Sequence, residues 1–265
     1  MIQLTGLKKA FGSKEITRGL DLTINTGEFI AIIGKSGEGK SVLLKQIIGL
    51  IKPDAGEVII DNEDVTKLKG RKQQEVFKKC GYVFQFAALL DSLTVFENIG
   101  ITLLEENIPQ EKVLPLVIEK LNSVGLSQDV LDRYPAELSG GMKKRVGLAR
   151  TLMLTPKILL YDEPTTGLDP MTTRLIHELI LDTHQKFNIT TVVISHDIEV
   201  FKFATHVAML YEGKIVYKGD AKTIWECDNP YIYQFIRGLP EGPIEQVGTQ
   251  QTNQPGTPTN EDSQQ

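Results

Sequence analysis

The sequence predicts an α/β fold built on a mainly parallel β-sheet. Continuous apolar runs of strand length occur at residues 29–33, 158–162 and 190–195. Residues 175–186 lie between the last two runs and have the apolar spacing of a crossover helix. A glycine-rich segment and a second helical pattern directly follow the first run. Strands that alternate with helices in this way form a parallel sheet that is covered on both faces.

The same patterns give the elements in chain order. The predicted strands in the first part of the chain are residues 2–7, 20–24, 29–33, 56–61 and 82–85. From about residue 91 to residue 133 the apolar residues recur at three-to-four spacing, which predicts a helical lobe inserted into the α/β core. After the strands at 158–162 and 190–195, the runs 207–211 and 214–217 flank Glu212-Gly213 and predict a hairpin with a two-residue turn.

Length and charge exclude some function classes. The chain has 265 residues, enough for one large domain or two closely packed lobes. Its net charge is −5, and the tail from Leu239 onward carries four acidic residues without Lys or Arg. The rest of the chain is therefore almost neutral. A nucleic-acid binder would show a basic stripe and an electrostatic lipid binder a basic cluster, so both classes are disfavoured.

The sequence shows no sign of secretion or of a membrane span. The N-terminus lacks a signal-peptide pattern, and no run approaches 18 apolar residues. Cys80 and Cys227 form no metal or redox motif, which is typical of reduced thiols in a cytosolic protein. We therefore expect a partner to hold the chain wherever it acts at a membrane. Residues 246–265 contain one aliphatic residue, Val247, and are expected to be disordered.

Residues 34–41 form the pattern G-x-x-x-x-G-K-S between a predicted strand and a predicted helix. The glycines let backbone N–H groups turn toward an anion, and the helix N-terminus adds its positive dipole end. Lys40 can reach the β- and γ-phosphates and Ser41 can ligate Mg²⁺. An ordinary glycine-rich turn is the alternative, but the strand and helix on either side favour nucleoside triphosphate binding. The candidate phosphate-binding residues are Gly34, Lys35, Ser36, Gly37, Glu38, Gly39, Lys40 and Ser41.

A second predicted helix start lies at Ser139-Gly140-Gly141. Ser139 is a good N-cap, and two glycines precede a helix that carries Lys143, Lys144 and Arg145. This arrangement gives a second anion-binding helix N-terminus, separate from the glycine loop. An ordinary capped helix with a basic face is the alternative.

Two candidate catalytic segments end predicted strands. Asp162 and Glu163 follow an apolar strand, where an Asp can hold Mg²⁺ and a Glu can orient and deprotonate a water. The alternative is two acidic residues that open a loop, which the upstream glycine loop disfavours. His196 follows the strand at 190–195, at the end where α/β proteins assemble ligand sites. A lone histidine is, however, more often structural.

In order and spacing, these motifs resemble the ATP-binding-cassette (ABC) ATPases, the nucleotide-binding subunits of ABC transporters. The resemblance extends from Ile2 to about Arg237. It implies a P-loop NTPase core with a mainly parallel sheet, an N-terminal antiparallel β-subdomain and an inserted α-helical subdomain. The implied domain limits are residues 1–238 for the ATP-binding domain, about 86–155 for its helical subdomain, and 239–265 for a C-terminal extension. The implied cofactors are ATP and Mg²⁺.

The resemblance also implies a role for each motif residue. Phe11 would stack on adenine, and Gln85 would contact Mg²⁺ and the attacking water, so that it senses the γ-phosphate. Asp162 would hold Mg²⁺ through water, and Glu163 would be the general base. His196 would contact the γ-phosphate. The implied catalytic residues are Glu163, His196 and Gln85, and the implied metal-binding residues are Ser41, Gln85 and Asp162.

A head-to-tail homodimer is a further implication. Asp169, within Gly167-Leu168-Asp169, matches the loop that links the two nucleotide sites of such a dimer. Ser139, Gly140 and Gly141 would close on the ATP bound by the other protomer. Because one chain carries one glycine loop and one signature segment, two complete sites require two copies.

Within the ABC ATPases, the chain is most similar to the Mla-type phospholipid-trafficking ATPases (MlaF family). Met142 stands where most transporters of this class have Gln or a charged residue, and the segments 84–98 and 233–243 also match. This similarity implies a peripheral position on the cytoplasmic side of the inner membrane, beneath a pair of permease subunits. The implied cargo is phospholipid, exchanged with a periplasmic lipid-binding protein. An accessory cytoplasmic subunit is a further candidate partner, and no nucleic acid is expected.

Two questions stay open at this point. The apolar stretch 86–90 fits a groove that receives a permease helix, or else it is core of the helical lobe. The chain could also serve an importer of another solute, or be a cassette ATPase that transports nothing and signals to a membrane partner. Cassettes of DNA repair are disfavoured, because they are interrupted by long coiled coils.

Overall fold

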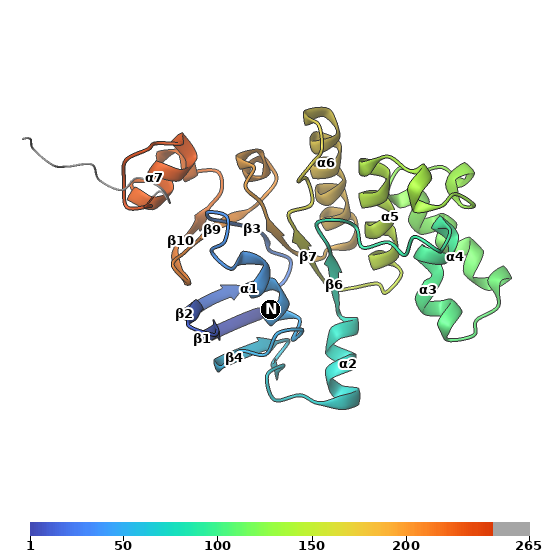
Figure 1. Ribbon diagram of the computed structural model, residues 1–265, viewed down its shortest axis with the longest axis horizontal. Helices are drawn as coiled ribbons and strands as arrows, with labels where there is room; N and C mark the ends of the chain where they lie inside the picture. The colour runs from blue at the N-terminus through green and yellow to red at the C-terminus, as the bar shows by residue number, and fades with distance from the viewer. Residues whose placement is uncertain (246–265) are drawn as a thin grey trace, which may run out of the picture.

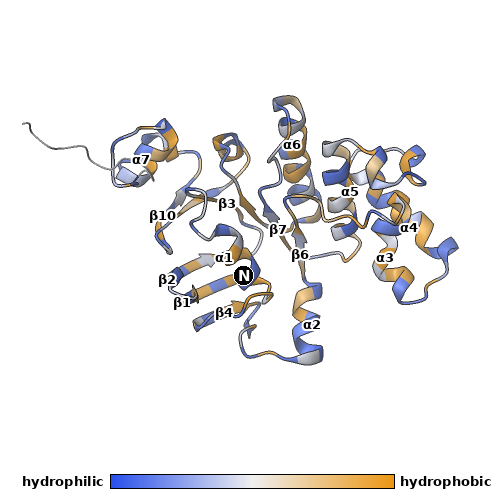
Figure 2. Cartoon of the chain, in the orientation of Figure 1, coloured by the Kyte–Doolittle hydropathy of each residue, from blue (hydrophilic) through white to orange (hydrophobic). Residues whose placement is uncertain are grey.

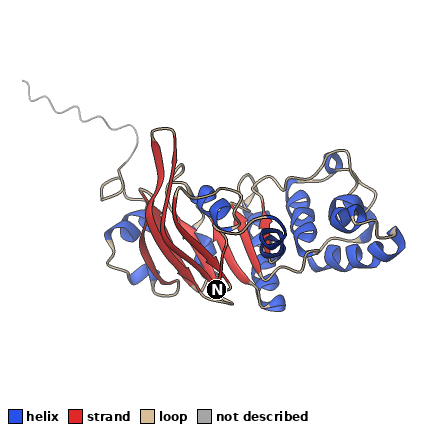
Figure 3. Ribbon diagram, turned by 90° about the horizontal axis from the view of Figure 1, so that it is seen from below, coloured by secondary structure: helices blue, strands red, loops and turns tan. Residues whose placement is uncertain are grey.

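The computed structural model describes residues 1–245, so the disorder expected from residue 246 lies outside the described residues. Within residues 1–245 the chain forms two β-sheets, with a group of helices at one end (Figures 1 and 3). The smaller sheet has the strand order β2-β1-β4-β5, and the larger one has the order β10-β9-β3-β8-β7-β6. The predicted α/β fold, with a mainly parallel sheet and an antiparallel N-terminal sheet, is confirmed.

The bounds of the elements are as follows. The strands are β1 (Ile2–Phe11), β2 (Lys14–Ile24), β3 (Phe29–Ile33), β4 (Ala55–Ile60), β5 (Glu63–Asp64), β6 (Cys80–Val83), β7 (Ile158–Asp162), β8 (Thr190–Ile194), β9 (His206–Tyr211) and β10 (Lys214–Asp220). The α-helices are α1 (Lys40–Ile47), α2 (Gly70–Lys78), α3 (Val95–Glu105), α4 (Gln110–Ser123), α5 (Gly140–Leu152), α6 (Pro170–Phe187) and α7 (Pro230–Arg237). Short 3₁₀ helices are η1 (Gln128–Val130), η2 (Pro135–Glu137), η3 (Ile198–Lys202) and η4 (Ile224–Glu226).

The register of the large sheet aligns the carboxyl ends of three parallel strands. Strands β9, β3, β8, β7 and β6 run parallel, and β10 is an antiparallel edge strand. Ile194 at the end of β8 pairs with Ile32 of β3 on one side and with Asp162 of β7 on the other. The loops that follow β3, β7 and β8 therefore leave the sheet next to one another, at the edge where α/β proteins bind their ligands.

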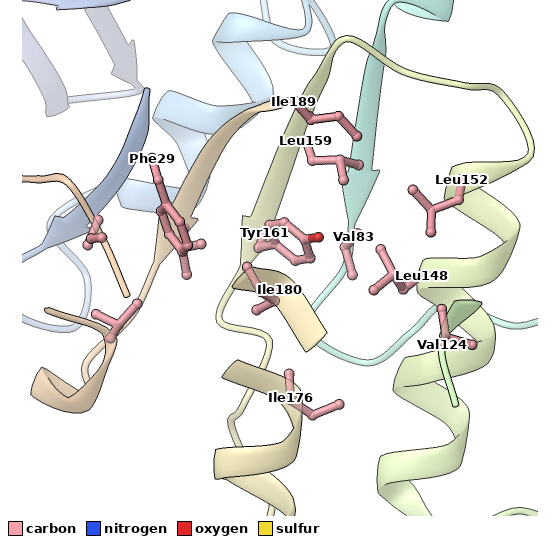
Figure 4. Packing of buried hydrophobic residues seen from close by; sticks show 14 of the residues in the cluster. Phe29, Val83, Val124, Leu148, Leu152, Leu159, Tyr161, Ile176, Ile180 and Ile189 are labelled. Carbon is pink, nitrogen blue, oxygen red and sulfur yellow. The ribbon is translucent and has the colours of Figure 1, made fainter. Parts of the chain in front are cut away.

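Alternate residues of the central strands face two different cores. Phe29 and Leu159 belong to the core that includes residues of α4, α5 and α6. Ile30 and Leu160 belong to the core that includes residues of α1 and the small sheet. Figure 4 shows Tyr161 next to Ile180 of α6 within the first of these cores. This double burial explains why β3 is apolar at every position (Figure 2). Each fully buried side chain of this size stabilises the fold by about 1.5–3 kcal/mol.

Helices α3, α4 and α5 lie together at one end of the molecule (Figure 1). The Thr94 side chain accepts a hydrogen bond from the N–H of Glu97, and Glu97 reaches back to Thr94, so a capping box starts α3. The buried amide of Asn98 bonds to the backbone N–H and C=O of Leu90 at 2.8 and 3.0 Å. These contacts fix the loop that enters the helical segment. The limits of about 86–155 for a helical subdomain stay a prediction.

The structure extends or corrects several predicted elements. Strand β1 continues to Phe11 rather than ending at residue 7. The prediction ended it too early because β-bulges near Leu7 interrupt the alternation of side chains that marks a strand in the sequence. Helix α6 begins at Pro170 rather than at 175, because the Asp169 side chain caps it. Helix α2 was missed, since only Val76 within it is buried and no apolar period marks it. Strand β6 ends at Val83, which leaves Gln85 in the following loop.

Candidate nucleotide-binding and catalytic site

The glycine loop after β3 has the backbone shape of an anion cradle. Gly34, Gly37 and Gly39 have φ angles of 150°, 85° and 91°, which only glycine adopts readily. A Cβ atom on Gly34 would lie 2.3 Å from the carbonyl oxygen of Leu210, so the loop also passes too close to β9 for any other residue. Gly39 immediately precedes α1, whose first N–H groups have no partner within the helix. The loop therefore presents backbone donors to a phosphate.

Lys40 lies inside this loop. Its ammonium donates hydrogen bonds to the carbonyl oxygens of Gly34 and Lys35, both at 2.8 Å, and only 4% of the residue is exposed. Burial lowers the pKa of Lys40 from its ordinary 10.5 to about 8, although Glu163, Glu38 and Asp162 oppose the shift. A buried ammonium held by two neutral carbonyls gains strongly from a nearby anion. The cradle thus fits a triphosphate.

Ser41 and Asp162 meet across the loop. The Ser41 hydroxyl donates to Oδ1 of Asp162 at 2.7 Å, and the Tyr82 hydroxyl donates to Oδ2 at 2.7 Å. The hydroxyl and carboxylate oxygens of Ser41 and Asp162 are the donors that Mg²⁺ prefers. The two residues therefore fit the expected metal site. Tyr82 was not found from the sequence, because its place beside Asp162 depends on the pairing of β6 with β7.

Glu163 is held by three side chains. His196 Nε2 lies 2.5 Å from Oε1 of Glu163, while Gln85 Nε2 and the Thr166 hydroxyl lie 3.4 and 3.1 Å from Oε2. The φ angle of Glu163 is 49°, a strained value for a non-glycine residue. Such strain persists only where the surrounding structure enforces it, and it concentrates at functional sites. The structure thus brings together all three predicted catalytic residues.

A cavity of about 200 Å³ adjoins this cluster. Glu163 and His196 line it together with Thr165, Thr166 and Ser195. It is large enough for several water molecules beside the Glu163 carboxylate. The site therefore has space for an attacking water next to a candidate base.

Other predicted residues lie at two different places. Phe11 ends β1 and is half exposed, with the Lys9 ammonium 5.4 Å from its ring centroid. It belongs to the β1–β2 hairpin, whose Ile16 packs against Gly39 of the glycine loop. The flat ring is exposed and free to stack, and its predicted role as an adenine platform stays a prediction.

The signature residues lie next to the loop of Asp169. The Ser139 hydroxyl accepts a hydrogen bond from the N–H of Met142 at 3.3 Å and so caps α5. A Cβ atom on Gly141 would lie 2.6 Å from the Thr172 side chain. The Asp169 carboxylate accepts from the N–H groups of Met171 and Thr172, both at 3.0 Å, and so caps α6. The predicted roles of these residues across a dimer stay predictions.

Lys35 and Glu38, on the outside of the cradle, contact the C-terminal part of the chain. Lys35 Nζ donates to the carbonyl oxygen of Glu245, and a Glu38 oxygen accepts from the N–H of Glu212 at 2.6 Å. These two contacts, like that of Tyr82, depend on tertiary structure and leave no local pattern in the sequence.

Comparison with known proteins identifies the family. The family model described as ABC transporter matches residues 17–166, which is more than half of the chain. This chain belongs to the ABC transporter family. It is accordingly an ATPase subunit of that family, and it binds ATP with Mg²⁺ as the usual cofactor. Within residues 1–245, no helix has the length and apolar character that a membrane span requires.

Individual relatives cover most of this ABC ATPase. The probable ribonucleotide transport ATP-binding protein mkl of Mycobacterium tuberculosis (strain ATCC 25618 / H37Rv) is 38% identical over 245 residues, which are 92% of this chain and 68% of mkl. The intermembrane phospholipid transport system ATP-binding protein MlaF of Haemophilus influenzae (strain ATCC 51907 / DSM 11121 / KW20 / Rd) is 34% identical over 246 residues, 92% of this chain and 93% of MlaF. These similarities confirm the predicted likeness to Mla-type ATPases.

A solved structure confirms the fold. The dimeric post-hydrolysis state of the ATP-binding cassette MJ0796, bound to ADP and Pi, superposes with a TM-score of 0.77 at 32% identity. The match covers 83% of this chain and 99% of MJ0796.

Proposed function

We propose that this chain powers a transporter that moves phospholipid between the inner membrane and a periplasmic lipid-binding partner. The observation that carries the proposal is the similarity to MlaF, which spans 92% of this chain and 93% of MlaF. Met142 and the segment 84–98, which resemble the Mla-type ATPases, support it independently of overall identity. The chain would lie on the cytoplasmic side of the membrane, held there by permease subunits.

Each residue of the site has a specific role in the proposed ATP hydrolysis. Lys40 and the N–H groups of the glycine loop bind the β- and γ-phosphates, and Phe11 stacks on adenine. Ser41 and Asp162, together with Gln85, would hold Mg²⁺, which would neutralise charge on the phosphates. Nothing in this arrangement requires a covalent intermediate.

Glu163 accepts the proton of the attacking water, since its carboxylate borders the water-sized cavity. His196 and Gln85 orient that carboxylate through their contacts to its two oxygens. As γ-phosphate and water enter, His196 exchanges part of its contact with Glu163 for the phosphate. Glu163 then acts on the attacking water, and His196 contacts the γ-phosphate.

We propose that the active form is a head-to-tail homodimer. Gly140 lies beside Leu168 and Gly141 beside Thr172, so the signature segment lies next to the loop of Asp169 rather than in the cradle of its own protomer. A second copy would supply this segment to the ATP site. The relative MJ0796 is dimeric in its structure with ADP and Pi. Sedimentation of the Glu163→Gln protein with ATP tests the dimer, and a strict monomer under all conditions would contradict it.

The loop after Gln85 offers a docking surface for a permease helix. Phe86 is 81% exposed, Leu90 is 46% exposed and Ala88 is also exposed, whereas Ala87 is buried. The alternative, in which residues 86–90 are core of the helical lobe, therefore holds only for Ala87, which is buried, and in part for Leu89, which is half-buried. Exposed apolar side chains gathered beside a catalytic glutamine suit a partner that must sense nucleotide.

Purification from native membranes in mild detergent, followed by mass spectrometry, tests the lipid proposal. A permease with a lipid-binding subunit and bound phospholipid would support it. The name of mkl favours a second candidate, ribonucleotide transport, for which a permease with a soluble-solute binding protein would be recovered. A membrane partner without a transport pathway would instead indicate a cassette that signals.

A further inference from the structure

Lys144 is a buried cation outside the nucleotide cradle. It lies on α5, five residues after Ser139, and is only 9% exposed. Burial lowers the pKa of its ammonium below the ordinary value, and the charge of Glu163 opposes that shift. A buried lysine must be held by hydrogen bonds, since an unpaired buried charge is strongly destabilising.

The partners of Lys144 belong to the loop that follows Glu163. Its Nζ donates to the carbonyl oxygen of Pro164 at 2.6 Å and to that of Thr166 at 2.8 Å. Hydrogen bonds from a charged donor are shorter and stronger than those between neutral groups. The ammonium thus closes the turn of residues 164–166 from inside.

That turn determines where the Glu163 carboxylate points. The N–H of Thr166 donates to the carbonyl of Glu163 at 3.3 Å, and the Thr166 hydroxyl donates to Glu163 Oε2 at 3.1 Å. Glu163 itself has a strained φ of 49°. Without a clamp on the turn, the backbone of Glu163 would relax toward a more common conformation.

The same helix supports the loop of Gln85. Arg150 donates to the carbonyl oxygens of Ala88 and Ala87 at 2.8 and 2.9 Å. Ala87 and Ala88 have φ angles of 60° and 48°, so this loop is strained as well. Helix α5 therefore holds two strained loops, each beside one predicted catalytic residue.

From these contacts we infer that Lys144 is a positioning residue for ATP hydrolysis, which holds the Glu163 carboxylate in place by clamping the turn of residues 164–166. The inference rests on the proposed role of Glu163 as general base. It also gives the signature helix a second task.

Steady-state ATP hydrolysis by the full chain tests this inference. Lys144→Met should lower kcat by between about ten-fold and a hundred-fold, the cost of a displaced catalytic group, while the KM for ATP changes less than about three-fold. Lys144→Arg, which keeps the charge and its donors, should restore most of kcat, and Lys144→Gln should lie between them. Lys120→Met, on a half-buried lysine of α4 outside the site, is the matched control and should behave as the wild type.

A double variant separates positioning from a general loss of structure. If Lys144 acts through Glu163, Lys144→Met should add no more than about two-fold to the loss in kcat that Glu163→Gln causes alone. An equal loss in both backgrounds would overturn the inference, as would wild-type kcat in Lys144→Met or a parallel collapse of kcat and ATP affinity. Should Lys144→Met fail to fold, Lys144→Gln carries the same comparison. Wild-type turnover by Glu163→Gln would instead overturn the assignment of the base.

Discussion

The Nε2 atom of His196 lies 2.5 Å from Oε1 of Glu163, although the two residues are 33 positions apart in the chain. The two side chains meet because β7 and β8 are adjacent parallel strands that end level with one another, with Asp162 opposite Ile194. The carboxylate is also held at its other oxygen by Gln85 and Thr166. Glu163 is therefore the most heavily oriented carboxylate of the site, which is the condition that a general base requires.

Replacement of Glu163 by Gln should abolish most turnover. Removal of a positioned general base costs about 10²–10⁴ in rate, and the amide keeps the shape and part of the hydrogen bonding. ATP affinity should stay within a few-fold of wild type, because the cradle of residues 34–41 is untouched. Single-turnover hydrolysis together with equilibrium nucleotide binding measures both quantities. Turnover within ten-fold of wild type would show that another group activates the water.

The parts of the site that were predictable share a local signal. Gly34, Lys40 and Ser41 belong to a fixed pattern between a strand and a helix, and Asp162 and Glu163 end an apolar run, so sequence alone locates both segments. Tyr82 and Lys144 carry no such signal. Each acts on a residue far away in the chain, through a hydrogen bond that exists only once β6 lies beside β7 or α5 lies against the turn after Glu163.

The same distinction applies to the fold. Strands β3, β7 and β8 are buried on both faces, so continuous apolar runs reveal them. Helix α2 buries only Val76 and begins without a side-chain cap, so neither an apolar period nor a cap indicates it. Strand β2 begins at Lys14, but its first residues are exposed or paired through bulges and therefore do not alternate.

The free energy of unfolding should depend on pH in a way that reflects the lowered pKa of the buried Lys40. In the folded chain its pKa is lowered to about 8, against 10.5 in the unfolded chain. Between these values the unfolded state binds more protons, so the contribution of Lys40 makes the nucleotide-free protein more stable as pH rises from about 8 to about 10.5. Each pKa unit corresponds to ~1.4 kcal/mol, so the gain over the whole window is at most about 3 kcal/mol.

Urea unfolding of wild type and Lys40→Met, compared at each pH, isolates this contribution because other lysines and tyrosines cancel in the difference. The free-energy difference between the two proteins should increase in favour of wild type from pH 8 to pH 10. A flat difference would mean that Lys40 keeps its ordinary pKa in the folded chain.

Tyr82→Phe should weaken the response to Mg²⁺. The Tyr82 hydroxyl is a donor to Asp162 Oδ2 at 2.7 Å, and it would orient the carboxylate that faces the metal. Loss of such a supporting hydrogen bond costs about ten-fold or more in metal affinity. Titration of ATP hydrolysis with Mg²⁺ should therefore give a half-saturating concentration about ten-fold higher, with the fold intact.

Tyr161→Phe is the matched control for that experiment. Tyr161 is fully buried on β7, and its hydroxyl has no hydrogen-bond partner within the described part of the chain. Its removal should leave the Mg²⁺ response unchanged and raise the free energy of unfolding by about 1 kcal/mol, because an unpaired buried polar group is lost. A shift in Mg²⁺ response in both variants would point to a general change in packing instead.

Phe86→Asp should release the protein from its membrane partner. Phe86 is 81% exposed and projects from the loop between Gln85 and Leu90, so a carboxylate there costs the isolated chain little. In a docked complex the same charge would be buried against an apolar permease helix without a partner, which weakens binding by several kcal/mol. After membrane fractionation the variant should therefore be found in the supernatant, while ATP binding by the purified protein persists.

Trp225→Asp is the control for this experiment. Trp225 is 49% exposed on η4, outside this loop, so its replacement should leave membrane association unchanged. Full retention of Phe86→Asp on membranes would exclude the loop as the docking surface.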